Sequence, residues 1–178
     1  MHRRDTIAEG ILATKALLAR YLAGFDDSNH TRQAPGLPNH VAWNLGHLAL
    51  TMHRVAEKFD ARPPSEFDFF SGKSAPPGSV RPADRFEIES VSFGSTPVGD
   101  PAKYPSLARC VEIYNHGCDR IAGAVRAADD ATLERPVPWG NGQTPLWALA
   151  QRMIFHNGDH TGQIACLRRA LQMKSIFA

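Results

Sequence analysis

Four apolar stripes constrain the fold of this chain of 178 residues more than any other feature of its sequence. In each stripe, large apolar side chains recur at steps of three and four residues, which places them along one face of an α-helix. The stripes predict helices over residues 6–25, 40–59, 106–127 and 145–171. Amphipathic helices of this length bury their apolar faces against one another, so we expect an all-α four-helix bundle. The length suits one domain spanning 1–178.

Capping signals mark where these helices begin. Thr6 is followed three residues later by Glu9, which is the spacing of a capping box. Asn39 stands before the second stripe and belongs to a residue type preferred as an N-cap, and the third stripe begins behind Pro105-Ser106. Pro145 follows a threonine at the start of the fourth stripe, and proline is well tolerated at the first helical position.

A long segment, residues 61–104, separates the second and third stripes. It is rich in proline and carries an aromatic cluster of Phe67, Phe69 and Phe70. Structureless connections of this length are uncommon in compact domains and often have a function. We expect a crossover that covers one mouth of the bundle, with these rings excluding water; an exposed Ω-loop is the alternative. A short strand is expected within 86–93, where apolar residues alternate.

Composition and charge exclude several classes of partner. The chain carries 20 Lys and Arg against 18 Asp and Glu, a net charge of +2, and its longest basic run is Arg168-Arg169. This distribution predicts neither a nucleic-acid partner nor a membrane partner. The sequence shows no signal peptide and no apolar window of 18 residues, so we expect a cytoplasmic protein that acts on a small molecule. A homodimer is compatible with the sequence.

Three cysteines, Cys110, Cys118 and Cys166, are odd in number and lack the CxxC spacing of a zinc ribbon. Free cysteines are among the most buried residue types. We therefore expect three buried thiols in a reducing compartment.

Two histidines interrupt the apolar stripe of the fourth helix. His156 and His160 are four residues apart, so their side chains lie one above the other on the same helical face. Each buried imidazole nitrogen without a partner costs roughly 1–3 kcal/mol. A shared cation would satisfy one nitrogen of each ring, whereas separate hydrogen bonds to protein groups are the alternative. We also expect Gly158 and Gly162 to allow close contact between helices.

A third ligand would have to come from another helix. There is no Glu-x-x-His motif for a di-iron carboxylate site, and an HExxH reading fails because Asn157 follows the first histidine of the pair. His40, His47, His53 and His116 remain as candidates. His40 and His47 share a polar ribbon on the second helix with Asn44 and Thr51, but helical periodicity places His47 on the flank of the apolar stripe.

The stretches "HVAWNLGHLA" and "GQTPLWALAQRMIFHNGDHTGQIACLRRAL" resemble the DinB/YfiT-like superfamily of four-helix bundles. The residues that carry the resemblance are Trp43, Gly46, His47, Gly142, Thr144, His156, His160, Gly162 and Gln163. In that superfamily, a histidine of the second helix and an HxxxH pair of the fourth make a three-histidine metal site. The resemblance therefore implies His47, His156 and His160 as ligands.

Three neutral nitrogen ligands leave coordination positions open, which is typical of a catalytic site and suits Zn, Ni or Fe. The resemblance implies a metal-dependent hydrolase or a thiol-dependent S-transferase, with a low-molecular-weight thiol as co-substrate. The alternative is a metal-binding or stress-response protein without turnover, and a purely structural bundle is a third interpretation. Asn44 and Gln163 are candidates to bond a ligand or a histidine N–H, and Arg152 is a candidate for substrate binding.

Overall fold

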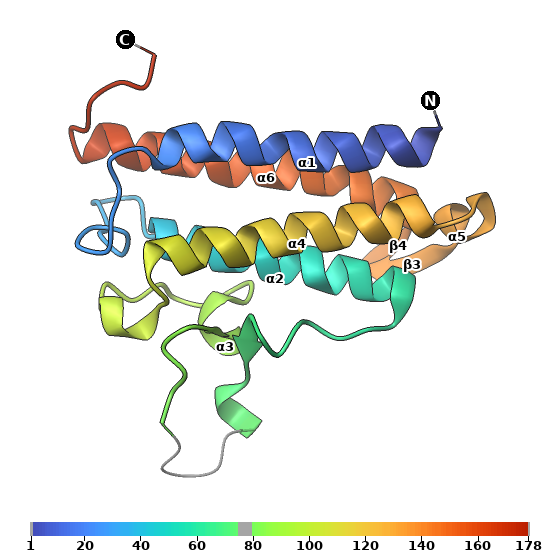
Figure 1. The fold of residues 1–178 in the computed structure, drawn as a ribbon, viewed down its shortest axis with the longest axis horizontal. Coiled ribbons are helices and arrows are strands. Elements are labelled where there is room, and N and C mark those ends of the chain that lie inside the picture. The colour runs from blue at the N-terminus through green and yellow to red at the C-terminus, as the bar shows by residue number, and fades with distance from the viewer. Residues whose placement is uncertain (1, 75–79, 178) are drawn as a thin grey trace.

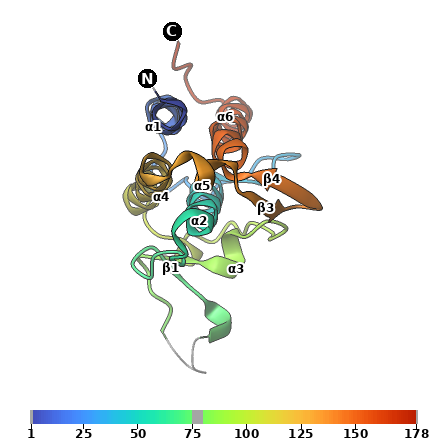
Figure 2. The same ribbon diagram turned by 90° about the vertical axis from the view of Figure 1, so that its right-hand side faces the viewer.

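A computed structural model describes residues 2–74 and 80–177. Four long helices pack side by side as a bundle (Figure 1 and Figure 2), which confirms the predicted all-α fold. They are α1 (Arg3–Leu22), α2 (Val41–Asp60), α4 (Leu107–Ala127) and α6 (Leu146–Ala170).

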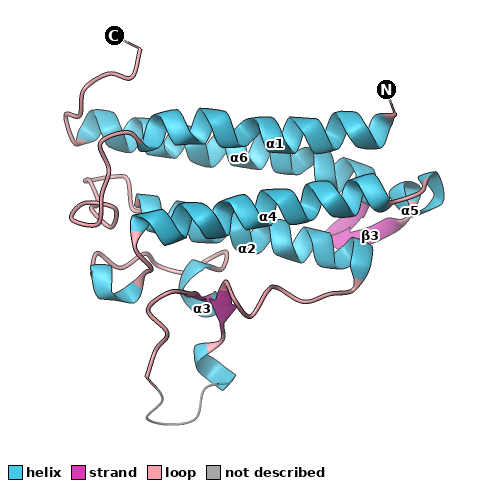
Figure 3. Cartoon of the chain, in the orientation of Figure 1, coloured by secondary structure: helices cyan, strands magenta, loops and turns pink. Residues whose placement is uncertain are grey.

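The remaining elements are short and lie in the connections (Figure 3). The segment between α2 and α4 contains β1 (Phe69–Phe70), η1 (Gly72–Ser74), β2 (Phe86–Glu87), α3 (Ile88–Val91) and η2 (Pro101–Lys103). The segment between α4 and α6 contains α5 (Asp130–Glu134), β3 (Pro136–Trp139) and β4 (Gly142–Pro145). β1 pairs with β2 in parallel, whereas β3 and β4 form an antiparallel hairpin in which Val137 faces Thr144.

The direction of the helices explains the long crossover. In Figure 1, α2 and α4 lie side by side and run the same way, while α1 and α6 run the opposite way. A helix of 20 residues is about 30 Å long, so the chain must travel back along the whole of α2 before α4 can begin. We call the segment 61–106 the crossover, and its described residues make this return along the outer side of α2.

The helix boundaries agree with the predictions except at α1, but the N-cap of α2 is His40 and not Asn39. Helix α1 begins at Arg3 rather than Thr6, because His2 is its N-cap and Asp5 accepts a hydrogen bond from the His2 backbone N–H. It ends at Leu22, close before Gly24, whose φ of 85° lies in the left-handed region. At the other end of the chain, Thr144 pairs within the β3–β4 hairpin instead of capping α6.

The first half of α2 is buried on all sides. Every residue from Val41 to Leu50 is buried, because the crossover packs on the side that faces away from the bundle. Contact is closest at Gly46, where a Cβ atom would lie only 2.8 Å from side-chain carbons of both Phe86 and Val91. Glycine at this position therefore lets the crossover approach the helix.

Gly46→Ala is expected to destabilise the protein by roughly 1–3 kcal/mol, because the added methyl group overpacks the contact with Phe86 and Val91. The measurement is equilibrium unfolding in urea. Gly162→Ala is the matched control on α6, where a Cβ would meet nothing within 4 Å, and it is expected to stabilise the helix by up to about 1 kcal/mol. Equal effects of the two substitutions would contradict this account.

The prediction that Gly158 and Gly162 allow close contact between helices is wrong. Gly158 and Gly162 do not bring helices into close contact, because a Cβ at either position would find open space. Both are exposed residues of α6.

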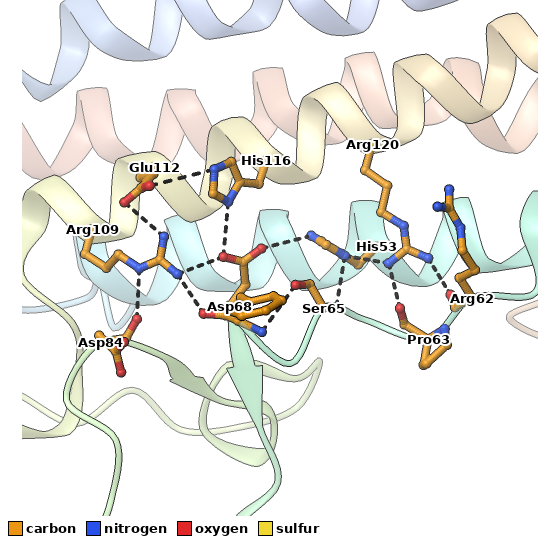
Figure 4. A network of polar contacts seen from close by, with 11 residues as sticks. His53, Arg62, Pro63, Ser65, Asp68, Asp84, Arg109, Glu112, His116 and Arg120 are labelled. Carbon is orange, nitrogen blue, oxygen red and sulfur yellow. Dashed lines mark hydrogen bonds and ion pairs between the residues drawn. The ribbon is translucent and has the colours of Figure 1, made fainter.

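A buried carboxylate joins the crossover to the bundle (Figure 4). Asp68 of the crossover is only 2% exposed. Its Oδ1 accepts a hydrogen bond from Arg109 Nη2 at 2.9 Å and lies 3.1 Å from His116 Nδ1. Its Oδ2 lies 3.8 Å from Nε2 of His53 on α2. Arg120 of α4 donates to His53 Nδ1 and to the carbonyl oxygen of Pro63. Two helices and the crossover thus share one polar network.

Two of the three cysteines are buried, as predicted, but Cys166 is exposed on α6. The prediction for Cys166 is wrong because it lies beside the buried stripe of α6 rather than within it. None of the helices in the part of the chain that the structure describes has both the length and the hydropathy needed to cross a bilayer.

Candidate metal centre

Three histidines from two helices meet between α2 and α6. One ring nitrogen each of His47, His156 and His160 lies within 4.8 Å of the other two. His47 comes from α2, and the other two are one helical turn apart on α6. The ring centroids are 4.7–5.2 Å apart, so the three imidazoles are immediate neighbours.

His47 is held by the crossover and by its own helix. Its Nδ1 lies 2.9 Å from the carbonyl oxygen of Val91, and because a carbonyl can only accept, Nδ1 carries the proton. The ring also stacks on Trp43, with centroids 4.7 Å apart and planes inclined by 6°. Trp43 donates in turn from Nε1 to Ser95 Oγ of the crossover. This arrangement leaves Nε2 of His47 unprotonated and available as a ligand.

His160 is oriented by a side chain rather than by the backbone. Its Nδ1 donates to Oδ1 of Asn44 at 2.6 Å, so Nε2 is the nitrogen left as an acceptor. Both residues are buried, with exposures of 6% and 0%. Asn44 therefore fixes the tautomer of His160, as carboxylates and carbonyls do for metal-binding histidines.

Asn44→Ala is expected to weaken metal binding by about 10- to 100-fold, because His160 loses the partner that holds its ring and tautomer. Isothermal titration of the metal-free protein with Zn²⁺ measures the effect. Asn39→Ala is the control, since Asn39 bonds Gln163 on α6 and no histidine. The role assigned to Asn44 would be excluded if both variants bound Zn²⁺ like the original chain.

A ring nitrogen of His156 is compatible with a bound ion. Its Nδ1 is buried and has no hydrogen-bond partner among the described residues. A buried nitrogen without a partner costs free energy, and a cation at this position would remove that cost.

All three imidazoles are neutral near pH 7. Burial, together with the charge of the neighbouring imidazoles, lowers the pKa of His156 to about 4 and that of His160 to about 3. Burial also lowers the pKa of His47. Because a metal binds only the deprotonated imidazole, the surroundings of these rings suit metal ligation.

The other candidate histidines have structural roles. His40 is the N-cap of α2, where Nδ1 accepts from the Trp43 backbone N–H, and its Nε2 lies 3.1 Å from the Val98 carbonyl oxygen. His53 and His116 belong to the Asp68 network.

Burial of His53 gives the protein an acid-sensitive stability. Burial, aided by the charge of Arg120, lowers its pKa to about 4, compared with about 6.5 in an unfolded chain. Between these values the unfolded chain binds more protons, so the free energy of unfolding falls as the pH falls. For metal-free protein we expect His53 to account for a loss of roughly 2 kcal/mol between pH 7.5 and pH 5.

Urea unfolding at these two pH values tests the expectation. His53→Gln should show a smaller decrease in stability between pH 7.5 and pH 5 than the original chain, whereas a variant of exposed His2 should show the same decrease. An unchanged decrease in His53→Gln would exclude the role of this imidazole.

A cavity of about 470 Å³ opens beside the histidines. It is lined by His47, Leu50, Thr51, Arg54, Phe93, Trp139, Gly140, Arg152, Met153 and His156. The crossover reaches the site through Val91 and Phe93.

The predicted role of the aromatic cluster is wrong, because none of its three rings lines the cavity. Phe67 is 83% exposed, Phe69 packs against His53 and Phe86, and Phe70 lies under the guanidinium of Arg81. The expected strand within 86–93 is limited to β2, and α3 follows it directly.

Arg152 and Gln163, the other two residues that the sequence suggested for the site, lie in different places. Arg152 lines the cavity, while Gln163 accepts from Asn39 and donates to Asp159. Sequence reasoning missed Arg54 and Trp139. Arg54 lies seven residues, or two helical turns, after His47 and therefore on the same side of α2, which is a signal that the sequence contained.

Comparison with protein families gave a match to the DinB superfamily over residues 11–164. Comparisons with curated proteins and with solved structures gave no match. The matched residues include all four long helices in large part and all three clustered histidines. On this evidence, the chain belongs to the DinB superfamily.

Proposed function

We propose that the chain binds one divalent metal, Zn, Ni or Fe, through His47, His156 and His160 and acts on a small molecule as a metal-dependent enzyme. The observation that carries the proposal is that two of these neutral imidazoles, His47 and His156, also line a cavity of about 470 Å³. This volume is typical of small-molecule sites. A three-histidine site leaves room for a further ligand, as catalytic metal sites do.

The lining of the cavity supports chemistry that depends on a metal. Among its lining residues there is no Asp, Glu, Lys, Ser or Cys, so the wall offers neither a carboxylate base nor a strong nucleophile. Bound there, a divalent metal supplies Lewis acidity that activates water or a thiol near neutral pH.

The residues around the site have separate roles in this proposal. Val91 and Asn44 orient His47 and His160 through hydrogen bonds to Nδ1. Leu50, Met153 and Trp139 give the cavity apolar walls that limit the access of water. A metal-dependent hydrolase and a thiol-dependent S-transferase with a low-molecular-weight thiol both fit these roles.

Two assays test the proposal on protein of measured metal content. The first follows hydrolysis of p-nitrophenyl acetate, and the second follows conjugation of cysteine to 1-chloro-2,4-dinitrobenzene. We expect turnover in one assay that chelation removes, that added metal restores and that His156→Ala lacks. One equivalent of bound metal without turnover in either assay would instead favour a non-catalytic metal-binding or stress-response protein.

A further inference from the structure

Two arginines flank the histidines in the wall of the cavity. Arg54 comes from α2 and Arg152 from α6, the same two helices that supply His47 and His156. Each guanidinium thus lies in the same cavity wall as an imidazole.

Among the described residues, no ion pair balances the charge of these arginines. No carboxylate lines the cavity, and among the described residues neither arginine takes part in an ion pair. The hydrogen bond of Arg54 goes to a neutral hydroxyl, Ser92 Oγ, at 3.3 Å. By contrast, Arg109 and Arg120 each pair with an aspartate.

The rest of the wall is apolar. Leu50 and Met153 form its buried part, and Trp139 contributes an aromatic ring from the hairpin. Phe93 of the crossover also lines the cavity although 92% of its surface is exposed. An exposed aromatic ring beside unpaired guanidinium groups is suited to a ligand that has both an apolar body and a negative charge.

We propose that the cavity binds a small organic carboxylate with an apolar body, and that Arg54 and Arg152 bind its carboxylate beside the three histidines. A guanidinium suits a carboxylate because its N–H groups match the two carboxylate oxygens. This inference rests on the proposed function, for which it names the substrate class. The carboxylate belongs either to the molecule that is transformed or to the thiol.

Isothermal titration with phenylacetate and with its neutral analogue, 2-phenylacetamide, tests the inference. We expect the metal-free protein to bind phenylacetate at least about tenfold more tightly than the amide, because charge-assisted hydrogen bonds are the stronger ones. Arg54→Gln and Arg152→Gln should each lower phenylacetate affinity about tenfold and leave amide binding unchanged. Arg169→Gln, which removes an exposed charge of α6 that does not line this cavity, is the matched control and should change neither.

Displacement of phenylacetate distinguishes the two sources of the carboxylate. The competitors are 3-mercaptopropionate and butyrate, a carboxylate of similar size without a thiol. Stronger displacement by 3-mercaptopropionate assigns the carboxylate to the thiol, and equal displacement assigns it to the other substrate.

Two results would overturn the inference. One is equal affinity of the metal-free protein for phenylacetate and the amide. The other is a preference for phenylacetate that persists in the double variant Arg54→Gln/Arg152→Gln with its unfolding midpoint unchanged. Metal content and turnover in the two assays decide the proposed function, and both are measured separately from phenylacetate binding, so the two failures are distinguishable.

Discussion

His160→Ala is expected to lower the affinity for a divalent metal by more than about a hundredfold, because it removes one of three ligands. Loss of a group that only orients a ligand costs about 10- to 100-fold, and loss of the ligand itself should exceed that. Zn²⁺ should also raise the unfolding midpoint of the original chain, since it binds the folded state selectively. His160→Ala should show little of this increase.

Elemental analysis of protein purified without added metal, together with titration of the stripped protein, measures both effects. A variant of exposed His2 is the control and should retain one equivalent of metal. If His160→Ala retained one equivalent with unchanged affinity, the three-histidine site would be ruled out. Acidification should release the metal, because protons compete for the same nitrogens.

Asp68→Ala is expected to destabilise the protein by about 3 kcal/mol. The substitution leaves Arg109 without its buried partner, and breaking a buried ion pair on one side typically costs about 3–5 kcal/mol. Since the Arg109 side chain is 19% exposed, water compensates for part of this loss, and the lower end of the range applies.

Urea unfolding and limited proteolysis measure the consequence. The crossover of Asp68→Ala should be cleaved faster than that of the original chain, because one of its links to α4 is lost. Asp84→Ala is the control on the same segment, where the carboxylate is 68% exposed and its loss should cost less than about 1 kcal/mol. A loss of less than about 1 kcal/mol for Asp68→Ala would mean that the network does not hold the crossover.

Periodicity predicted the bundle because the buried faces of its helices consist mainly of apolar side chains at helical spacing. Leu149, Met153, Ile164 and Leu167 are all buried, in the order that the stripe of the fourth helix predicts. The hairpin of β3 and β4 was missed because prolines normally argue against a strand. In this two-stranded ribbon, Pro136 faces Pro145 at the open end, where the absent N–H groups cost little.

The candidate site was harder to derive from periodicity. His47 lies on the flank of the α2 stripe, yet it is only 5% exposed, because Val91 and its neighbours in the crossover cover that flank. A helical wheel describes contacts with other helices and contains no information on a loop that packs from outside. Family resemblance therefore selected His47 where the spacing of residues did not. The same limit applies to Phe93, whose place at the cavity depends on the path of the crossover.

The parallel run of α2 and α4 also bears on the order in which the molecule assembles. Closing a connection of some 45 residues carries an entropic cost that has to be met before its contacts form. The carbonyl of Val91 reaches His47 only when that closure is complete, whereas the pair on α6 is set by a single helical turn. We therefore expect the helical pair to be in place early and the third imidazole to be oriented late, so that a competent metal centre marks the final stage of folding.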